Sequence, residues 1–375
     1  MHGKKLLAAA ATAAVLFGAC SSTSPSASSG GGGGGSSATG TVALLLPEKQ
    51  TARYEAADKP FFEAKFKSAC PSATLNYQNA AEDANTQKSQ AEAAMTAGAK
   101  VLVLDPVDGD AAGSIVTEAA GKGVKVISYD RLIKGGAKPD FYISFDNEKV
   151  GELQGQALLD KLTADGKTNA KVVWINGSPK DNNATLFKQG AHKILDGKVT
   201  IVKEDAMANW KAEEAQAIMA AAISAVGKDG YDAVYVANDG GAGGAYAAEV
   251  SAGVDPKTKP MTGQDAQVDA IQRILAGTQY MTVYKAIQPE AEQAAQLACD
   301  LLSGKSPTAS ATVNNGTADI ASFLLTPIAV TADGKASGTK SVADTVVKDQ
   351  FYGSDSVTKI CTSDFKTFCD QFGIK

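Results

Sequence analysis

Histidine is scarce in this sequence of 375 residues, which contains only His2 and His192. A histidine-based zinc centre and a Ser-His-Asp triad are therefore not expected. The five cysteines include no C-x-x-C pair. The chain also lacks a Gly-x-x-x-x-Gly-Lys-[Ser/Thr] phosphate loop and a Gly-x-Gly-x-x-Gly turn after a strand. We accordingly predict no metal, no cofactor and no catalytic residue.

An excess of positive charge is also lacking, since 36 Lys and Arg residues face 41 Asp and Glu residues, for a formal net charge of −5. This balance gives no basic surface for nucleic acid, so we expect no nucleic-acid partner. Beyond the N-terminal residues, no run is apolar enough to span a bilayer.

The first 40 residues have the composition of a targeting segment and a linker. Lys4 and Lys5 precede the apolar run Leu6–Phe17, which is followed by Gly18, Ala19 and Cys20. This order resembles a bacterial lipobox, with Phe17 where Leu is usual. We predict a signal peptide over 1–19 and a lipid on Cys20; the alternative is an ordinary secretion signal cut nearby. Residues 21–40 are rich in Ser and Gly and predict a flexible tether.

Four cysteines remain after Cys20, an even number that favours disulfides in an exported protein. Four cysteines allow three pairings, and we expect Cys361 with Cys369 and Cys70 with Cys299. Free buried thiols or another pairing are the alternatives.

The rest of the chain alternates short β-branched runs with longer helical stretches, which predicts an α/β fold with parallel, doubly wound sheets. The first series runs from a strand at 41–46 to a long helix at 147–162. The alternation restarts with a strand at 171–175 and continues to an extended segment at 322–330. About 335 residues exceed one usual core, so we expect two similar lobes that face each other across a cleft.

Polar and aromatic side chains follow the predicted strands, at the strand ends where ligands of such sheets bind. These residues are Arg53, Tyr54, Asp130, Arg131, Asp181, Asn183, Asn238, Asp265 and Lys285. Paired charges and amides suit the hydroxyls of a sugar, and the rings of Tyr54 and Trp210 suit its C–H faces.

Several stretches together resemble the xylose-binding branch of the type 1 periplasmic binding protein family. They are Tyr129–Arg131 (YDR), Phe141–Leu153 (FYISFDNEKVGEL), Gly177–Phe187 (GSPKDNNATLF), Gly263–Ala266 (GQDA), Gly277–Lys285 (GTQYMTVYK) and Asn314–Pro327 (NNGTADIASFLLTP). They span nearly the whole folded part, about 41 to 350. The tail from Lys359, with Cys361 and Cys369, has no counterpart in this resemblance.

The resemblance implies a receptor rather than an enzyme, with sugar contacts from Arg53, Asp130, Arg131, Asp181, Asn183, Trp210, Asn238, Asp265 and Lys285, and with Tyr54 as a stacking ring. It also implies a three-segment hinge, which we place near 166–170, 278–280 and 314–317. The N-terminal lobe would then comprise 41–167 and 280–315, and the C-terminal lobe 168–279 and 316–375. We expect a monomer that takes a monosaccharide, D-xylose above others, to an ABC permease from the outer face of a cell membrane.

Some residues also have plainer interpretations. Asp265 could cap the helix that begins near Val268, and Asn182 or Asn183 the helix from Ala184. Asp239 could orient Asn238, Arg131 could form a structural ion pair, and Trp210 could belong to the core. At the level of function, the alternatives are a receptor for glucose, arabinose or galactose, a sugar sensor, and a glycoside-processing enzyme that uses two carboxylates.

Overall fold

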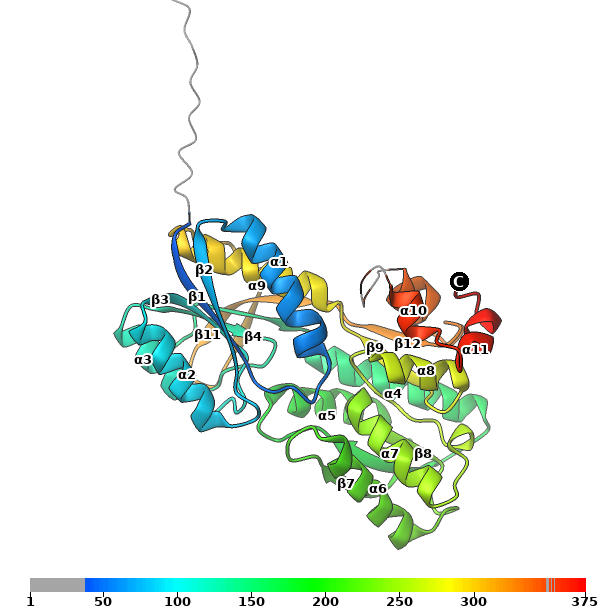
Figure 1. Ribbon diagram of the computed structural model, residues 1–375. Helices are drawn as coiled ribbons and strands as arrows, with labels where there is room; N and C mark the ends of the chain where they lie inside the picture. The colour runs from blue at the N-terminus through cyan, green and yellow to red at the C-terminus, as the bar shows by residue number, and fades with distance from the viewer. Residues whose placement is uncertain (1–37, 349–350, 352, 354) are drawn as a thin grey trace, which may run out of the picture. The chain divides into compact units, whose positions relative to one another are not determined.

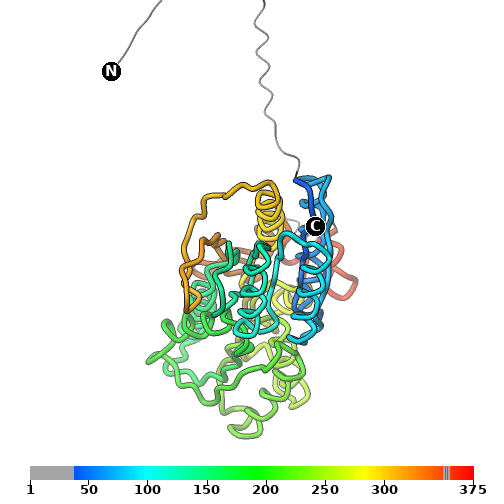
Figure 2. Tube along the Cα trace, turned by 90° about the vertical axis from the view of Figure 1, so that its left-hand side faces the viewer, coloured from blue at the N-terminus to red at the C-terminus, as the bar shows by residue number. Residues whose placement is uncertain are grey.

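The computed structural model describes residues 38–348, 351, 353 and 355–375. The predicted signal peptide, Cys20 and most of the tether lie outside these residues. Two sets of elements form two lobes, and both views show the second lobe, in green and lime, below the first (Figures 1 and 2). In the described part of the chain, no helix combines the length and apolarity needed to cross a bilayer.

The N-terminal lobe is built on a seven-stranded sheet in the order β10-β11-β5-β4-β3-β1-β2. Every neighbouring pair is parallel except β10 and β11. Its strands are β1 (Gly40–Leu46), β2 (Ala73–Asn79), β3 (Ala99–Leu104), β4 (Lys125–Tyr129), β5 (Phe141–Phe145), β10 (Ala311–Asn314) and β11 (Asp319–Leu325). Its helices are η1 (Tyr54–Asp58), α1 (Lys59–Ala69), α2 (Ala84–Thr96), α3 (Gly113–Gly121) and α9 (Ile287–Leu302).

The C-terminal lobe is also built of strands covered by helices, with two three-stranded sheets, β7-β6-β8 and β13-β12-β9. Single bridges at Met261 and Gln264 connect β8 to β9. The strands are β6 (Lys171–Asn176), β7 (Thr200–Ala206), β8 (Ala233–Val236), β9 (Met281–Tyr284), β12 (Ile328–Thr331) and β13 (Thr339–Ser341). The helices are α4 (Asn147–Ala164), α5 (Asn182–Leu195), α6 (Ala212–Val226), α7 (Asp239–Ser251), η2 (Pro256–Thr258), α8 (Val268–Ala276), η3 (Ala343–Val347), α10 (Ser356–Ile360) and α11 (Lys366–Gln371).

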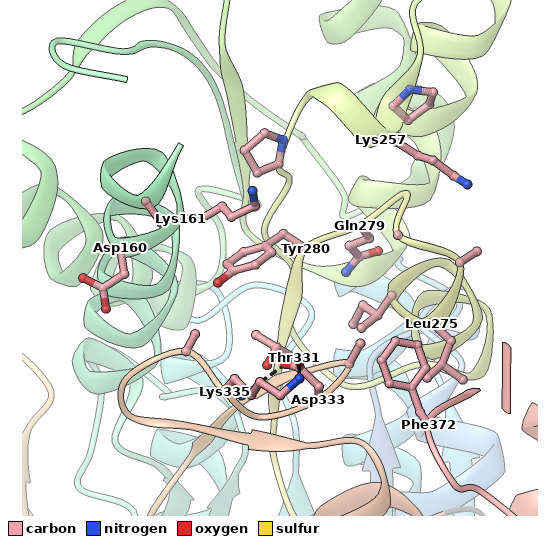
Figure 3. Close-up of a pocket in the computed structure, with 18 of the residues that line it drawn as sticks. Asp160, Lys161, Lys257, Leu275, Gln279, Tyr280, Thr331, Asp333, Lys335 and Phe372 are labelled. Carbon is pink, nitrogen blue, oxygen red and sulfur yellow. Dashed lines mark hydrogen bonds and ion pairs between the residues drawn. The ribbon is translucent and has the colours of Figure 1, made fainter. Parts of the chain in front are cut away.

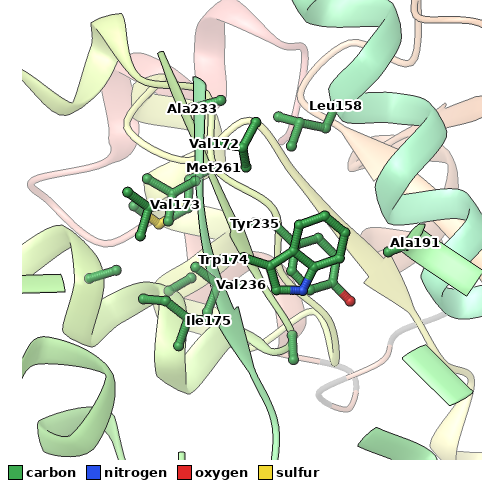
Figure 4. Close-up of a cluster of buried hydrophobic side chains, with 14 of the residues drawn as sticks. Leu158, Val172, Val173, Trp174, Ile175, Ala191, Ala233, Tyr235, Val236 and Met261 are labelled. Atoms are coloured by element: carbon green, nitrogen blue, oxygen red, sulfur yellow. The ribbon is translucent and has the colours of Figure 1, made fainter. Parts of the chain in front are cut away.

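The core of the C-terminal lobe shows why these segments are strands. All residues of β6 after Lys171 are buried, as expected for a strand covered on both faces. Trp174 of β6 packs on Tyr235 of β8, with 4.3 Å between ring centroids (Figure 4). The predicted α/β class, with two similar lobes of mainly parallel strands, is confirmed.

The predicted hinge positions and lobe boundaries were wrong. Helix α4 packs against α5, β8 and β9 of the C-terminal lobe, so the first crossing lies at Asp146, between β5 and α4. Strand β9 belongs to the C-terminal lobe and α9 to the N-terminal lobe, which places the second crossing at Lys285–Ala286. The third lies at Thr326–Pro327, between β11 and β12, within the segment predicted as one extended run.

Close packing of α4 on α5 explains the first error. A Cβ added at Gly151 of α4 would lie 2.0 Å from the carbonyl oxygen of Phe187, and one at Gly190 of α5 would lie 2.0 Å from that of Glu148. The two glycines allow the helix backbones to approach each other closely. Periodicity reveals that α4 is a helix, but not which lobe it covers.

The C-terminal tail, which in the structure includes Phe351 as well as the residues from Lys359, packs on α8 and reaches the boundary between the lobes. Gln272 of α8 donates to the carbonyl oxygen of Ile360 over 3.0 Å. Phe351 packs edge-on against Tyr284 of β9, with centroids 5.0 Å apart. The same apolar cluster contains Ala57 of η1, in the N-terminal lobe. The tail therefore contributes to contact between the two lobes.

Two disulfides have the pairing expected from the sequence. Cys70 at the end of α1 is bonded to Cys299 in α9, across 229 residues. Cys361 is bonded to Cys369 across 8 residues, which links α10 to α11. The first disulfide joins the start of the N-terminal lobe to the helix with which the chain returns to it.

Removing the disulfides one at a time should give unequal losses of stability. In the chain-entropy model, Cys70→Ala with Cys299→Ala should lower the free energy of unfolding by about 5 kcal/mol, and Cys361→Ala with Cys369→Ala by about 2.5 kcal/mol, because the longer loop restricts the unfolded chain more. Urea unfolding of the two double variants measures both values. A larger loss for the Cys361–Cys369 pair would contradict the prediction.

Candidate functional site

A cleft between the lobes gathers the residues that follow the strands. Its lining comprises Thr51, Arg53, Tyr54, Asp130, Arg131, Asp181, Asn183, Phe187, Trp210, Asn238, Gln264, Asp265 and Lys285. All nine residues predicted as sugar contacts are among them, together with Tyr54. Each of these ten is at most 7% exposed. The space that they surround, including the part open to solvent, is about 290 Å³.

Asp130 lies directly after β4 in a left-handed backbone conformation, with φ of 51°. Its carbonyl oxygen accepts hydrogen bonds from Ser144 Oγ (2.6 Å), Tyr142 OH (3.2 Å) and Asn183 Nδ2 (3.1 Å). Such a conformation is uncommon for a residue with a side chain and persists only where the surroundings fix it. These three bonds hold the Asp130 carboxylate at the cleft.

Arg53 is the centre of a buried ion network. Its guanidinium donates to both carboxylate oxygens of Asp58 (2.9 and 2.7 Å), to Asp130 Oδ1 (3.2 Å) and to Glu290 Oε2 (2.9 Å). Burial raises the pKa of Glu290 well above its usual value, and the opposing effect of the Arg53 charge does not cancel this shift. Arg53 therefore links η1, the end of β4 and α9.

Arg131 has a second set of carboxylates. Its Nε lies 3.2 Å from Asp181 Oδ2 and 3.7 Å from Asp105 Oδ1, and its NH2 lies 4.0 Å from Glu48. Burial raises the pKa of Asp105 well above its usual value, because the Arg131 charge does not outweigh the loss of solvent. Since Asp181 belongs to the C-terminal lobe, the Arg131–Asp181 pair joins the two lobes.

Lys285 occupies the second crossing between the lobes. Its Nζ lies 3.3 Å from Asp265 Oδ1 and 3.7 Å from Asp130 Oδ1, so it bridges carboxylates of the two lobes. Burial acts to raise the pKa of Asp130, but the charges of Arg53, Lys285 and Arg131 outweigh it and hold that pKa below its usual value. Asp130 is thus an ionised acceptor.

Aromatic rings complete the cleft. The Tyr54 ring lies under two guanidiniums, with its centroid 5.4 Å from Arg53 and 5.7 Å from Arg131. Trp210 packs edge-on against Phe187 at 6.4 Å, and its buried Nε1 has no hydrogen-bond partner among the described residues. A Cβ at Gly177 would lie 1.9 Å from the Trp210 ring, so glycine there is required for this ring position.

The capping interpretations are settled residue by residue. Asp181 caps α5, and its carboxylate accepts a hydrogen bond from the backbone N–H of Asn183. Asn238 caps α7, and its side-chain oxygen accepts from the backbone N–H of Gly241. Capping by Asn182 or Asn183 was wrong. So was capping by Asp265, because Gln267 precedes α8 without a side-chain bond.

Asp239 supports the cleft from behind. Its carboxylate accepts hydrogen bonds from Thr282 Oγ1 (2.8 Å), Gln279 Nε2 (2.7 Å) and the backbone N–H of Gln267 (3.0 Å). Burial raises the pKa of Asp239 to about 8. Asp239 therefore ties the loop that carries Asp265 to β9. Its carboxylate makes these bonds rather than one to the Asn238 side chain.

Four network carboxylates were missed from the sequence: Glu48, Asp58, Asp105 and Glu290. These four do not line the cleft itself, whereas three lining residues outside the predicted set do: Thr51, Phe187 and Gln264. Asp105 follows β3 directly and carries the same strand-end signal as Asp130. Asp58 and Glu290 lie at or in helices, where only tertiary packing brings them to Arg53.

The arrangement combines buried carboxylates, three cations, amides and rings. Among the described residues, no group of three or more His, Cys, Asp or Glu side chains is arranged to hold a metal ion. Donors and acceptors from both lobes line a small space, so the cleft can hydrogen-bond a compact polyhydroxylated molecule from several sides.

Comparison with known proteins places the chain in a family. Residues 42–306 match the model of the periplasmic binding protein domain. The D-xylose-binding periplasmic protein of Escherichia coli is 42% identical over 280 residues, which cover 73% of this chain and 80% of that protein. The multiple sugar-binding periplasmic receptor of Rhizobium radiobacter is 34% identical over 309 residues, 78% of this chain and 86% of the receptor.

A solved structure has the same architecture. The ABC transporter solute binding protein of Clostridium phytofermentans with bound β-D-glucose superposes with a TM-score of 0.73 at 28% identity, covering 84% of this chain and 99% of that one. The chain belongs to the periplasmic binding protein family and has its type 1 fold, as predicted.

Arg53 should be as important for stability as for the cleft. Arg53→Met should lower the free energy of unfolding by about 3–5 kcal/mol, because Asp58, Asp130 and Glu290 would stay buried without its charge. Urea unfolding measures the change. Lys193→Met is the control, since Lys193 pairs with Glu148 and Glu152 at the surface and should contribute at most about 1 kcal/mol. Equal losses in the two variants would refute this role.

Proposed function

We propose that this protein is an exported receptor that binds a monosaccharide, D-xylose above others, in the cleft and delivers it to an ABC importer. The observation that carries the proposal is the ring of buried, paired charges from both lobes around a small space. We choose D-xylose among the aldoses because the chain is 42% identical to the D-xylose-binding periplasmic protein of Escherichia coli.

The buried ion network around the cleft contains more acidic than cationic side chains, although the cleft itself is lined by three of each. Glu48, Asp58, Asp105, Asp130, Asp181, Asp265 and Glu290 face only Arg53, Arg131 and Lys285 among the described residues. Sugar hydroxyls both donate and accept hydrogen bonds, so they can pair with the lining carboxylates and with the lining cations. An analogue that lacks a hydroxyl would leave a buried acceptor unpaired, which is the basis of selection.

Binding is coupled to closure of the lobes. A ligand that touches Arg131 on one lobe and Asp181, Asn238 or Asp265 on the other makes its full set of contacts only when the lobes are closed. It therefore shifts the equilibrium towards the closed form by the free energy of those extra contacts. A permease that recognises the closed form would then receive loaded receptor.

Export and anchoring complete the proposal. A lipid on Cys20 and a tether of about 20 residues, with a reach of about 25 Å, would keep the receptor near the membrane as a monomer. A sensor that presents the closed form to a signalling receptor would use the same cleft. An enzyme is disfavoured, because Asp130 is held ionised by cations and the family relatives are named as binding proteins.

Titration calorimetry with D-xylose, L-arabinose, D-glucose, D-galactose and D-ribose tests the function. D-Xylose should bind most tightly, and Arg131→Ala should weaken it by at least about 30-fold, or 2 kcal/mol, because a buried charged hydrogen bond is lost. Lys134→Ala is the matched control, since Lys134 is an exposed cation three residues along the chain. Folded protein that gives no heat with any of the five sugars would rule out the proposal.

Closure predicts a distant effect on affinity. Phe351→Ala should weaken D-xylose binding by about fivefold, or 1 kcal/mol, because the Phe351 ring shares an apolar cluster with Ala57 of the opposite lobe. Phe365→Ala, which removes a tail ring that contacts Phe368 instead, should leave the Kd unchanged. Equal Kd values for both variants and the unchanged protein would show that the tail takes no part in closure.

A further inference from the structure

A second cavity lies at the opposite edge of the C-terminal lobe (Figure 3). Pro260 and Tyr280, which line it, precede the bridge at Met261 and strand β9, whereas the cleft residues Asp265 and Lys285 follow them. Its space, including the part open to solvent, is about 1860 Å³, against about 290 Å³ for the cleft. It is therefore a separate and much roomier site.

The C-terminal tail supplies one wall of this cavity. Phe368, Gln371 and Phe372, in and after α11, face residues of α4, α8 and the segment that follows β12. The Cys361–Cys369 disulfide ties α11 to α10. Since Gln272 of α8 bonds the carbonyl oxygen of Ile360, this wall is fixed to the lobe.

Tyr280 is at the centre of the cavity. Figure 3 shows its ring between Lys161 on one side and the Lys335–Asp333 pair on the other, with Leu275 and Phe372 beyond. The ring is half-buried. Burial and nearby carboxylates, Asp160 first among them, raise the pKa of Tyr280. The hydroxyl therefore stays neutral and can both donate and accept.

Charges of both signs and amides surround Tyr280. Lys161, Lys257, Lys259 and Lys335 are donors, Asp160 and Asp333 are acceptors, and Gln156 and Gln371 are both. This mixture does not select a simple anion or cation. Like the cleft, it has donor and acceptor side chains beside aromatic rings, but around a larger space.

We propose that this cavity, centred on Tyr280 and walled by the C-terminal tail, is a second binding site that takes a neutral oligosaccharide. The hydroxyls of successive sugar units match the lysine, aspartate and glutamine side chains that line the cavity, and their C–H faces match the rings of Tyr280 and Phe372. Its larger space admits several units, which the small cleft does not. The site does not depend on which sugar the cleft binds.

Titration of the full chain with xylotetraose and with maltotetraose tests the second site. The Arg131→Ala variant, whose cleft is impaired, should still bind at least one of the two, with a Kd on the order of 1 mM because the site is open to solvent. Tyr280→Ala in that background should weaken this binding about tenfold or more, and so should Phe372→Ala. Tyr246→Ala, a half-buried tyrosine of α7 outside the cavity, should leave it unchanged.

Two outcomes would overturn the proposal. One is the absence of heat with both tetrasaccharides. The other is binding that neither Tyr280→Ala nor Phe372→Ala weakens. The Tyr280→Ala change in the otherwise unaltered protein should leave the Kd for D-xylose within about twofold, which shows that the lobe is folded. If the unaltered protein binds a tetrasaccharide but does not bind D-xylose, only the cleft proposal would be contradicted.

Discussion

Burial of charge between the two lobes is the constraint on which the rest of the structure depends. Asp130 forms ion pairs with Arg53, at the start of η1, and with Lys285, at the second crossing. Lys285 also pairs with Asp265 of the other lobe. Ionised groups are costly to remove from water unless each is paired and hydrogen-bonded. The left-handed backbone at Asp130, the helix caps and the bonds behind Asp239 all serve to hold partners in place.

The same constraint explains why the cleft suits a neutral polyhydroxylated ligand. The network has more carboxylates than cations, and burial raises the pKa of Asp105 and of Glu290. A charged ligand would have to be desolvated among fixed charges of both signs. Hydroxyl groups can instead donate to one neighbour and accept from another, so they fit a network of donors and acceptors without adding charge.

The three crossings and the tail decide how the lobes meet. Each crossing is one or two residues long, at Asp146, Lys285–Ala286 and Thr326–Pro327. One of these residues, Lys285, also lines the cleft. Short crossings allow rotation while they preserve each lobe. The tail adds Phe351 to an apolar cluster that includes Ala57 of the opposite lobe, and its last helix walls the cavity around Tyr280.

The sequence by itself determined the class of fold and the strand ends that carry polar groups, because strand periodicity and local order are read directly along the chain. The resemblance of its motifs to a known family supplied the rest of the predicted cleft residues, Asn183 and Trp210 among them. The sequence determined neither the lobe that α4 covers nor the arrival of Asp58 and Glu290 at Arg53. Those depend on the glycine contacts between α4 and α5 and on the packing of α9 beside α1, which join residues far apart in the chain. Only the tertiary structure decided these contacts, because the periodicity of a helix shows which of its faces is buried but not which other element covers that face.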